Sequence, residues 1–196
     1  ATAATYSGLL TLGSASSIVA SSGNLVLSNT GTITGSGFGL TLGGTNAASS
    51  VASIIGTDAG TLTKNGTGTR SLTAENTYTG ATTVNAGTLK LDFSAAGAPT
   101  TNIISSSSAL VLGGGTLNLT GKASTTNSQA FNGTTINPGL SAITLSANAT
   151  ANPLSLNLGA ITRNVGSALR ITQPTGTLSA TNGVLTSSGT ASTILL

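Results

Sequence analysis

The most constraining feature of this sequence is a short strand-like segment that recurs along the whole chain. The copies are GLLTL at Gly8, GTIT at Gly31, GTLTK at Gly60, GTLKL at Gly87, GTLNL at Gly115, SAITL at Ser141, SALRI at Ser167 and STILL at Ser192. Their starts follow one another at a nearly constant spacing. A unit of about 26 residues is too long for one hairpin and matches one coil of a solenoid.

The pattern inside each unit indicates β-strands and not helices. Stretches such as NLVLSNTGTIT and LVLGGGTLNLTG alternate aliphatic with small polar residues, which is the period of a half-buried strand. Apolar residues at the helical spacing i, i+3, i+4 and i+7 are lacking, while Gly, Asn and Ser stand where corners are expected. The sequence therefore predicts an all-β parallel β-helix of about 7–8 coils, formed by residues 1–196 as a single domain.

A column of inward aliphatic side chains is expected to hold the coils together. Burial of each such side chain stabilises the fold by about 1.5–3 kcal/mol. The stacking residues predicted from the repeat are Ile33, Leu62, Leu89, Leu117, Ile143, Leu169 and Ile194.

The composition excludes several classes of function. Only 5% of the 196 residues are charged, whereas 64 are Ser or Thr, 27 are Gly and 16 are Asn. The pI of about 9.8 rests on six scattered cations with few aromatic residues, which argues against nucleic-acid binding. The chain contains no Cys and no His, and no run of 18 apolar residues long enough to span a membrane. The first residue is not Met and no signal peptide is visible, so the sequence reads as a processed piece or a segment of a larger protein.

One stretch carries a family resemblance. KNGTGTRSLTAENTYTGATTVNAGTLKL, residues 64–91, resembles the autotransporter-associated β-strand repeat, also called the passenger-associated transport repeat, of very large bacterial surface proteins. The positions that carry the match are Lys64, Gly66, Gly68, Leu72, Asn76, Thr77, Tyr78, Gly80, Thr82, Val84, Gly87 and Leu89. Arg70 stands where the family tends to have Leu, and Ala74 and Ala81 stand where Gly is frequent. The resemblance implies a secreted or surface-exposed bacterial β-helix, right-handed, with a structural or adhesive role and no catalytic residue.

Within this stretch the residues predict one three-sided coil. Strands are expected at residues 77–79, 82–84 and 88–91, with a turn at Gly80 and a corner at 85–87. The run KNGTGTR resembles a phosphate loop only superficially, because it lacks the Gly-Lys-Ser/Thr order and a following helix. It is interpreted as a corner between strands.

Catalysis and ligand binding receive little support from the residue types. The three acids, Asp58, Glu75 and Asp92, are expected on different columns as solvated charges, and no His or Cys can activate a serine. We therefore predict no enzyme activity, no cofactor and no metal site. Ice binding would need one threonine column through all coils. The position of Thr34 and Thr63 is expected to hold Lys90, Asn118, Thr144 and Arg170 in later coils, which would break that column.

The remaining expectation concerns assembly. Neither ATAATYSGLLTLG nor TSSGTASTILL carries a charge, a proline or a helix to cap an open β-helix. We therefore expect either that the native chain continues past both ends or that subunits stack head to tail into an extracellular filament. The alternative is an adhesin shaft that presents its Thr and Asn side chains to glycans or cell surfaces. The last stretch, TLSATNGVLTSSGTASTILL, is expected to form a final coil or a strand donated to a neighbour.

Overall fold

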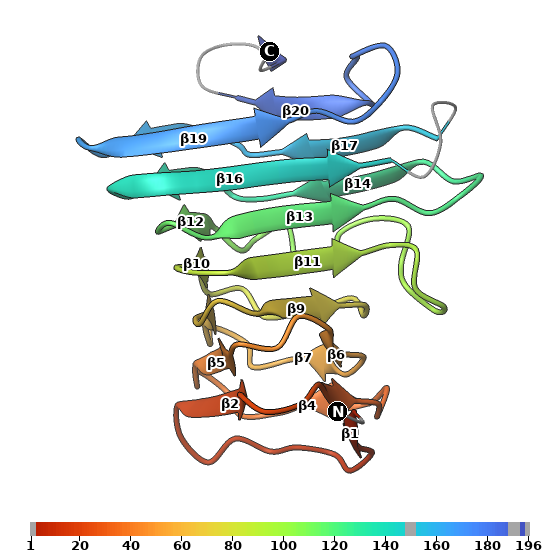
Figure 1. Cartoon of the computed structure of the whole chain (residues 1–196), viewed down its shortest axis with the longest axis vertical. Helices are drawn as coiled ribbons and strands as arrows, with labels where there is room; N and C mark the ends of the chain where they lie inside the picture. Colours follow the sequence, from red (N-terminus) through yellow and green to blue (C-terminus); the bar gives the residue numbers. More distant parts are fainter. Residues whose placement is uncertain (1–2, 148–151, 188–192, 195–196) are drawn as a thin grey trace.

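The computed structural model describes residues 3–147, 152–187 and 193–194, and within them the chain winds through 21 β-strands with no α-helix. The coils rise from the N-terminus at the bottom of Figure 1 to the C-terminus at the top. None of the described residues belongs to a helix long and apolar enough to cross a membrane.

Sheet 1 is the largest sheet and faces the viewer in Figure 1. All its neighbouring strands pair in parallel. Its eight strands, in spatial order, are β1 (Ala4–Tyr6), β3 (Leu25–Leu27), β6 (Ser49–Val51), β9 (Thr69–Leu72), β11 (Thr88–Asp92), β13 (Thr116–Thr120), β16 (Gly139–Ser146) and β19 (Ser167–Thr172).

Sheet 2 precedes sheet 1 in each coil and is also entirely parallel. Its seven strands are β2 (Ser16–Ala20), β5 (Leu40–Gly44), β8 (Leu62–Lys64), β10 (Thr82–Val84), β12 (Leu110–Leu112), β15 (Thr134–Ile136) and β18 (Ile161–Arg163).

The third face is interrupted. It consists of a two-stranded and a four-stranded sheet, and isolated bridges at Asn76–Ile104 and Thr101–Ser128 lie on the passes between them. Its strands are β4 (Thr32–Ile33), β7 (Ile54–Ile55), β14 (Asn127–Ala130), β17 (Leu154–Asn157), β20 (Gly183–Thr186) and β21 (Thr193–Ile194). The last strand, β21, pairs antiparallel with β20 of the same chain. Residues 188–192 and 195–196 of the final stretch lie outside the described residues, so the donation of a strand to a neighbour stays a prediction.

These features confirm the predicted fold class, a parallel β-solenoid. Sheet 1 strands run to the right in front and third-face strands run to the left behind as the chain climbs, so the coil is right-handed. The seven strands of sheet 2 are separated by six turns, slightly fewer than the seven to eight coils predicted. The difference arises because the passes at the two ends do not contribute strands to every face.

The turns differ in length along the rod. One turn of sheet 1 runs from Arg70 to its partner Leu89, and the next runs from Leu89 all the way to Leu117. The length of a turn is the number of residues between register partners on neighbouring strands. On sheets 1 and 2, every turn below β11 is as short as, or shorter than, the shortest turn above it. We call the turns below β11 the tight turns and those above it the wide turns. The extra residues of the first wide turn form a loop that descends beside the rod after β11 (Figure 1).

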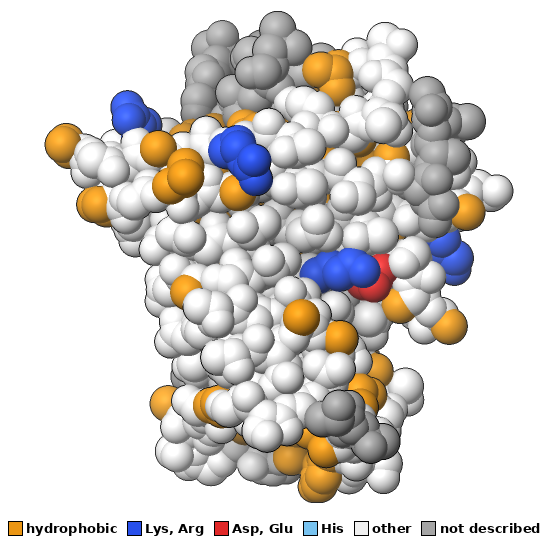
Figure 2. Space-filling view, viewed as in Figure 1, with side chains coloured by type: hydrophobic (Ala, Val, Ile, Leu, Met, Phe, Trp, Pro, Cys, Tyr) orange, Lys and Arg blue, Asp and Glu red, His pale blue; other side chains and the backbone are white. Residues whose placement is uncertain are grey.

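Alternation along each strand creates the core. In β11 and β13 every second side chain is buried, and the others lie half-buried on the outer surface. The buried side chains are mostly Leu and Ile and form one continuous cluster. The outer face of sheet 1 carries mainly uncharged side chains, with a few cationic groups and one adjoining acidic group (Figure 2).

Candidate functional site

The stretch that resembles a known repeat, residues 64–91, forms the centre of the tight turns. Strands form at 82–84 and 88–92, and Gly87 occupies the corner between them with φ of 60°. Residues 77–79 do not form the strand that the sequence predicts; the backbone there makes a single bridge, at Asn76. The run KNGTGTR is a corner between β8 and β9, as interpreted.

Asn76 replaces the missing strand with its side chain. Its Oδ1 accepts from the backbone N–H of Ile55 in the turn below at 2.8 Å, and its Nδ2 donates to the carbonyl of Ile103 in the turn above at 2.8 Å. The side chain is 1% exposed, so neither backbone group has water as an alternative partner. One amide thereby links three successive turns.

Tyr78 anchors a second buried chain of hydrogen bonds. Its hydroxyl lies 2.7 Å from Oγ1 of Thr82, which lies 2.9 Å from Oγ of Ser108, and that hydroxyl donates to the carbonyl of Gly80 at 2.8 Å. Burial raises the pKa of Tyr78, because the phenolate would lose its hydration. The network joins this turn to the next at the corner where sheet 2 begins.

Two glycines of the repeat are required by close packing of the backbones. A Cβ on Gly80 would lie 2.4 Å from the carbonyl oxygen of Gly60, and one on Gly87 would lie 2.4 Å from the carbonyl oxygen of Gly68. Both contacts involve backbone that cannot move without breaking the ladder. These corners are therefore tighter than any other residue type allows.

Lys64 lies inside the solenoid with no exposed surface. Its Nζ donates to three backbone carbonyls at the corner, those of Asn65 (2.8 Å), Gly66 (2.6 Å) and Ala86 (3.0 Å). Burial, with a smaller contribution from the nearby charge of Arg70, lowers the pKa of Lys64 to about 8.

Arg70 is a second buried cation and is 2% exposed. Its guanidinium donates to the carbonyls of Gly43 in the turn below and of Thr69 beside it, the latter at 3.0 Å. Burial lowers its pKa as well. Sequence analysis did not predict that either cation is internal. Strand alternation was the available signal, since Lys64 shares a side with Leu62 and Arg70 shares one with Leu72.

The predicted stack of seven aliphatic residues is not one column. Leu89, Leu117 and Ile143 do lie in register on sheet 1, but the column continues downward to Arg70 and upward to Ile171. The other predicted members lie elsewhere, with Ile33 in β4, Leu62 in β8, Leu169 opposite Ser141 and Ile194 in β21. The physical reason is that the tight and wide turns differ in length, so a constant period drifts from one face to another.

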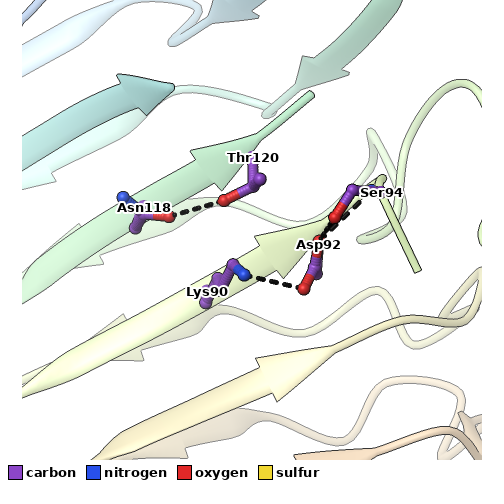
Figure 3. Close-up of polar contacts among 5 residues, drawn as sticks. All are labelled: Lys90, Asp92, Ser94, Asn118 and Thr120. Atoms are coloured by element: carbon purple, nitrogen blue, oxygen red, sulfur yellow. Dashed lines mark hydrogen bonds and ion pairs between the residues drawn. The ribbon is translucent and has the colours of Figure 1, made fainter. Parts of the chain in front are cut away.

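The exposed charges do not form a catalytic cluster. Lys90 and Asp92 form an ion pair of 2.7 Å on the outer face of β11, and Oδ1 of Asp92 accepts from both the backbone and the hydroxyl of Ser94 (Figure 3). Although burial opposes the shift, the bonds from Lys90 and Ser94 hold the pKa of Asp92 below its usual value. Glu75 is exposed and lines a shallow hollow of about 360 Å³. Among the described residues no three His, Cys, Asp or Glu side chains gather into a metal-binding group.

The expected break in the threonine column is wrong, because the residues assigned to that column lie in different columns. Thr63 is paired with Thr41 below and Thr83 above on sheet 2, whereas Lys90, Asn118 and Thr144 form a different outward column on sheet 1. Thr34 and Arg170 belong to neither column. The outward threonines of sheet 2 are therefore aligned.

Comparison with known proteins supports the resemblance found in the sequence. The profile of the family described as Passenger-associated-transport-repeat matches residues 62–91. A stretch of 89 residues, 45% of the chain, is 44% identical to a protein named Adhesin BmaC autotransporter from Brucella suis biovar 1 (strain 1330). The predicted similarity to this repeat is thus confirmed for that segment. The aligned stretch spans only 3% of the length of that relative. No solved structure matches this chain.

Proposed function

We propose that this chain is a non-catalytic shaft segment of a bacterial surface protein, positioned outside the cell. The observation that carries the proposal is the unbroken parallel register of sheet 1, in which eight strands stack turn upon turn around one apolar core. Such a solenoid forms an extended, stiff rod, because each turn packs only on its neighbours along one axis. The similarity to a passenger repeat and to a protein named as an autotransporter adhesin agrees with this role.

We further propose that the shaft continues by β-strand addition at its ends, either into more coils of a longer chain or into another copy. On the upper end, β19 has no further described strand beside it, and its inward residues Leu169 and Ile171 remain half-buried. At the lower end all three residues of β1 are exposed, and Leu9 beyond them is 64% exposed. An open parallel edge with adjoining apolar side chains is suited to further strand pairing.

Electron microscopy with size-exclusion light scattering, at several protein concentrations, tests end-to-end growth. We expect fibres one solenoid wide that lengthen with concentration. The double substitution Leu169→Lys and Ile171→Lys should abolish them, because it places two charges on the end that must be covered. Asn118→Lys, on the outer face of the same sheet, is the matched control and should leave fibres unchanged. Short monodisperse rods of the unmodified chain at every concentration would contradict self-assembly, although not a shaft within a longer chain.

An adhesive role is the second candidate, favoured by the 44% identity to a relative whose name includes adhesin. In that case the outer faces of the rod would contact a glycan or a cell surface. An oligosaccharide array probed with the labelled chain separates the two candidates. A shaft alone should give no signal above that of an unrelated β-solenoid, whereas an adhesin segment should retain a defined set of sugars.

A further inference from the structure

The outer face of sheet 2 carries a regular array that the uneven turn length hides in the sequence. The register aligns one outward residue from each strand, and from bottom to top these are Ser17, Thr41, Thr63, Thr83, Val111, Thr135 and Thr162. Five of the seven are Thr, and Val111 has the same branched shape as Thr without the hydroxyl. The lowest and highest members are exposed, and the five between them are half-buried.

A second column runs beside the first. Two residues after the outward residue of the first column, the triplets TKN, TVN, TIN and TRN each place an Asn, and the other turns place Val19, Gly43 and Gly113. The backbone N–H groups of these asparagines each donate to the strand below, for example from Asn85 to the carbonyl of Lys64 at 3.0 Å. Side-chain amides also bond along the column, from Asn85 to Asn65 at 3.0 Å and from Asn164 to Asn137 at 2.8 Å.

The two columns form a regular grid. Strand geometry sets a repeat of about 4.8 Å between turns and about 6.6 Å between outward residues along a strand. Threonine is β-branched and therefore restricted at χ1, and the amide-to-amide bonds fix the asparagines. The residues two positions before the threonines are Gly39, Thr61, Ala81, Ala109, Gly133 and Ala160, so no large side chain rises above the grid on that side.

Charge and aromatic content decide which partner such a face fits. Neither outward column contains a charged or aromatic residue. A polysaccharide would be expected to stack on aromatic side chains, and a charged partner would be expected to meet opposite charges. The protein face instead presents a regular array of uncharged hydroxyl, methyl and amide groups. Such an array complements a partner that is also uncharged, repeats in two dimensions, and both donates and accepts hydrogen bonds. Crystalline water has those properties.

We propose that the outer face of sheet 2 is an ice-binding surface. Its threonine and asparagine columns hold a layer of water in positions continuous with an ice crystal. This function goes beyond the shaft role and does not depend on end-to-end growth, because the face lies along the side of the rod.

Partition of the fluorescently labelled chain into a slowly growing ice hemisphere, together with an ice-recrystallisation assay, tests the proposal. We expect the chain to be enriched in ice at least tenfold over Thr83→Lys, which puts a charge at the centre of the grid. Thr144→Lys, the same change on the outer face of sheet 1, should keep full enrichment. Val111→Thr makes the column an unbroken run of threonines from Thr41 to Thr162 and should increase enrichment about twofold. Circular dichroism verifies that all variants keep the strand content of the unmodified chain.

Three results would overturn the proposal: exclusion of the unmodified chain from ice, equal enrichment of Thr83→Lys, or an equal loss with Thr144→Lys. Retention on microcrystalline cellulose with no enrichment in ice would assign the face to polysaccharide instead. None of these results bears on the shaft role, which the fibre measurements test separately.

Discussion

The tight turns below β11 and the wide turns above it solve the same folding problem with different interiors. In the tight turns, the buried cations Lys64 and Arg70 occupy inward positions of columns whose other buried members are mostly aliphatic. In the wide turns, the corresponding positions hold Leu112 and Leu117, and the additional residues leave the coil as loops. The column positions are equivalent in register, yet the chemistry of the side chains is opposite.

Corner geometry explains the difference. Around Gly66 and Gly87 the corner backbones of successive tight turns approach closely, and the carbonyls of Asn65, Gly66 and Ala86 surround the buried Nζ of Lys64. A buried carbonyl without a donor costs about 1–3 kcal/mol, and a cationic side chain supplies several donors from one position. At the wide corner the backbone N–H of Gly114 donates to Oγ of Ser141 at 2.9 Å, and aliphatic side chains complete the core. A buried cation is thus favourable only where backbone carbonyls of adjacent turns surround it.

The largest expected change in the free energy of unfolding comes from exchanging a cationic and an aliphatic side chain within one column. Leu117→Arg puts a guanidinium where an aliphatic residue is fully buried, and should destabilise the protein by about 4 kcal/mol. Arg70→Leu, two turns lower, should cost only about 2 kcal/mol, since it leaves carbonyls unpaired but removes a buried charge. Urea unfolding followed by circular dichroism measures both. Equal costs, or a stabilising Arg70→Leu, would show that the tight corner does not need its cation.

A smaller effect is expected at the corners themselves. Gly87→Ala should destabilise the protein by about 3 kcal/mol, because φ is 60° and the new Cβ would lie 2.4 Å from the carbonyl oxygen of Gly68. Gly97→Ala, in the loop of the first wide turn, is the matched control. It has φ of 78° but nothing within 4 Å of the new Cβ, so it should cost about 1 kcal/mol. Thermal unfolding of both variants measures how much of the lost stability at Gly87 is due to close backbone packing. Equal losses in the two variants would show that close packing contributes nothing.

Sequence analysis predicted the solenoid class, the apolar alternation and the corner at Gly87, because these depend on local pattern. It misplaced Ile33 and Leu62, because a constant period cannot follow turns that are short up to β11 and long beyond it. For the same reason it missed the aligned threonines of sheet 2. The internal Lys64 could have been found from alternation alone, whereas the three carbonyls that surround it come from two different turns and depend on the register.

Stability should respond to pH through Lys64. Its pKa is about 8 in the folded protein and 10.5 in an ordinary environment, so between these values the unfolded chain binds a proton that the folded protein lacks. The free energy of unfolding should therefore rise by about 2 kcal/mol from pH 8 to pH 10. Above pH 10 it should fall, since Tyr78 ionises in the unfolded chain before it does in the folded one.

Lys64→Met provides the control for this profile. Urea unfolding at pH 7, 8, 9 and 10 should give a rising stability for the unmodified protein and a flat one for Lys64→Met. A rise of the same size in the variant would assign the pH dependence to another group. A flat profile in both would mean that the three carbonyls stabilise the ammonium enough to cancel the effect of burial.

The smallest effect is expected at the surface ion pair of the first wide turn. Lys90→Ala removes the bond to Asp92, but the lysine side chain remains 29% exposed in the folded protein, so the loss should be at most about 0.5 kcal/mol. Asp92→Ala should cost about 1 kcal/mol, because it also removes the acceptor of two bonds from Ser94 that begin the descending loop (Figure 3). Raising the salt concentration to 1 M should erase the effect of Lys90→Ala and leave most of that of Asp92→Ala. If Lys90→Ala costs as much as Asp92→Ala, the start of the loop depends on the ion pair itself and not on the two bonds from Ser94.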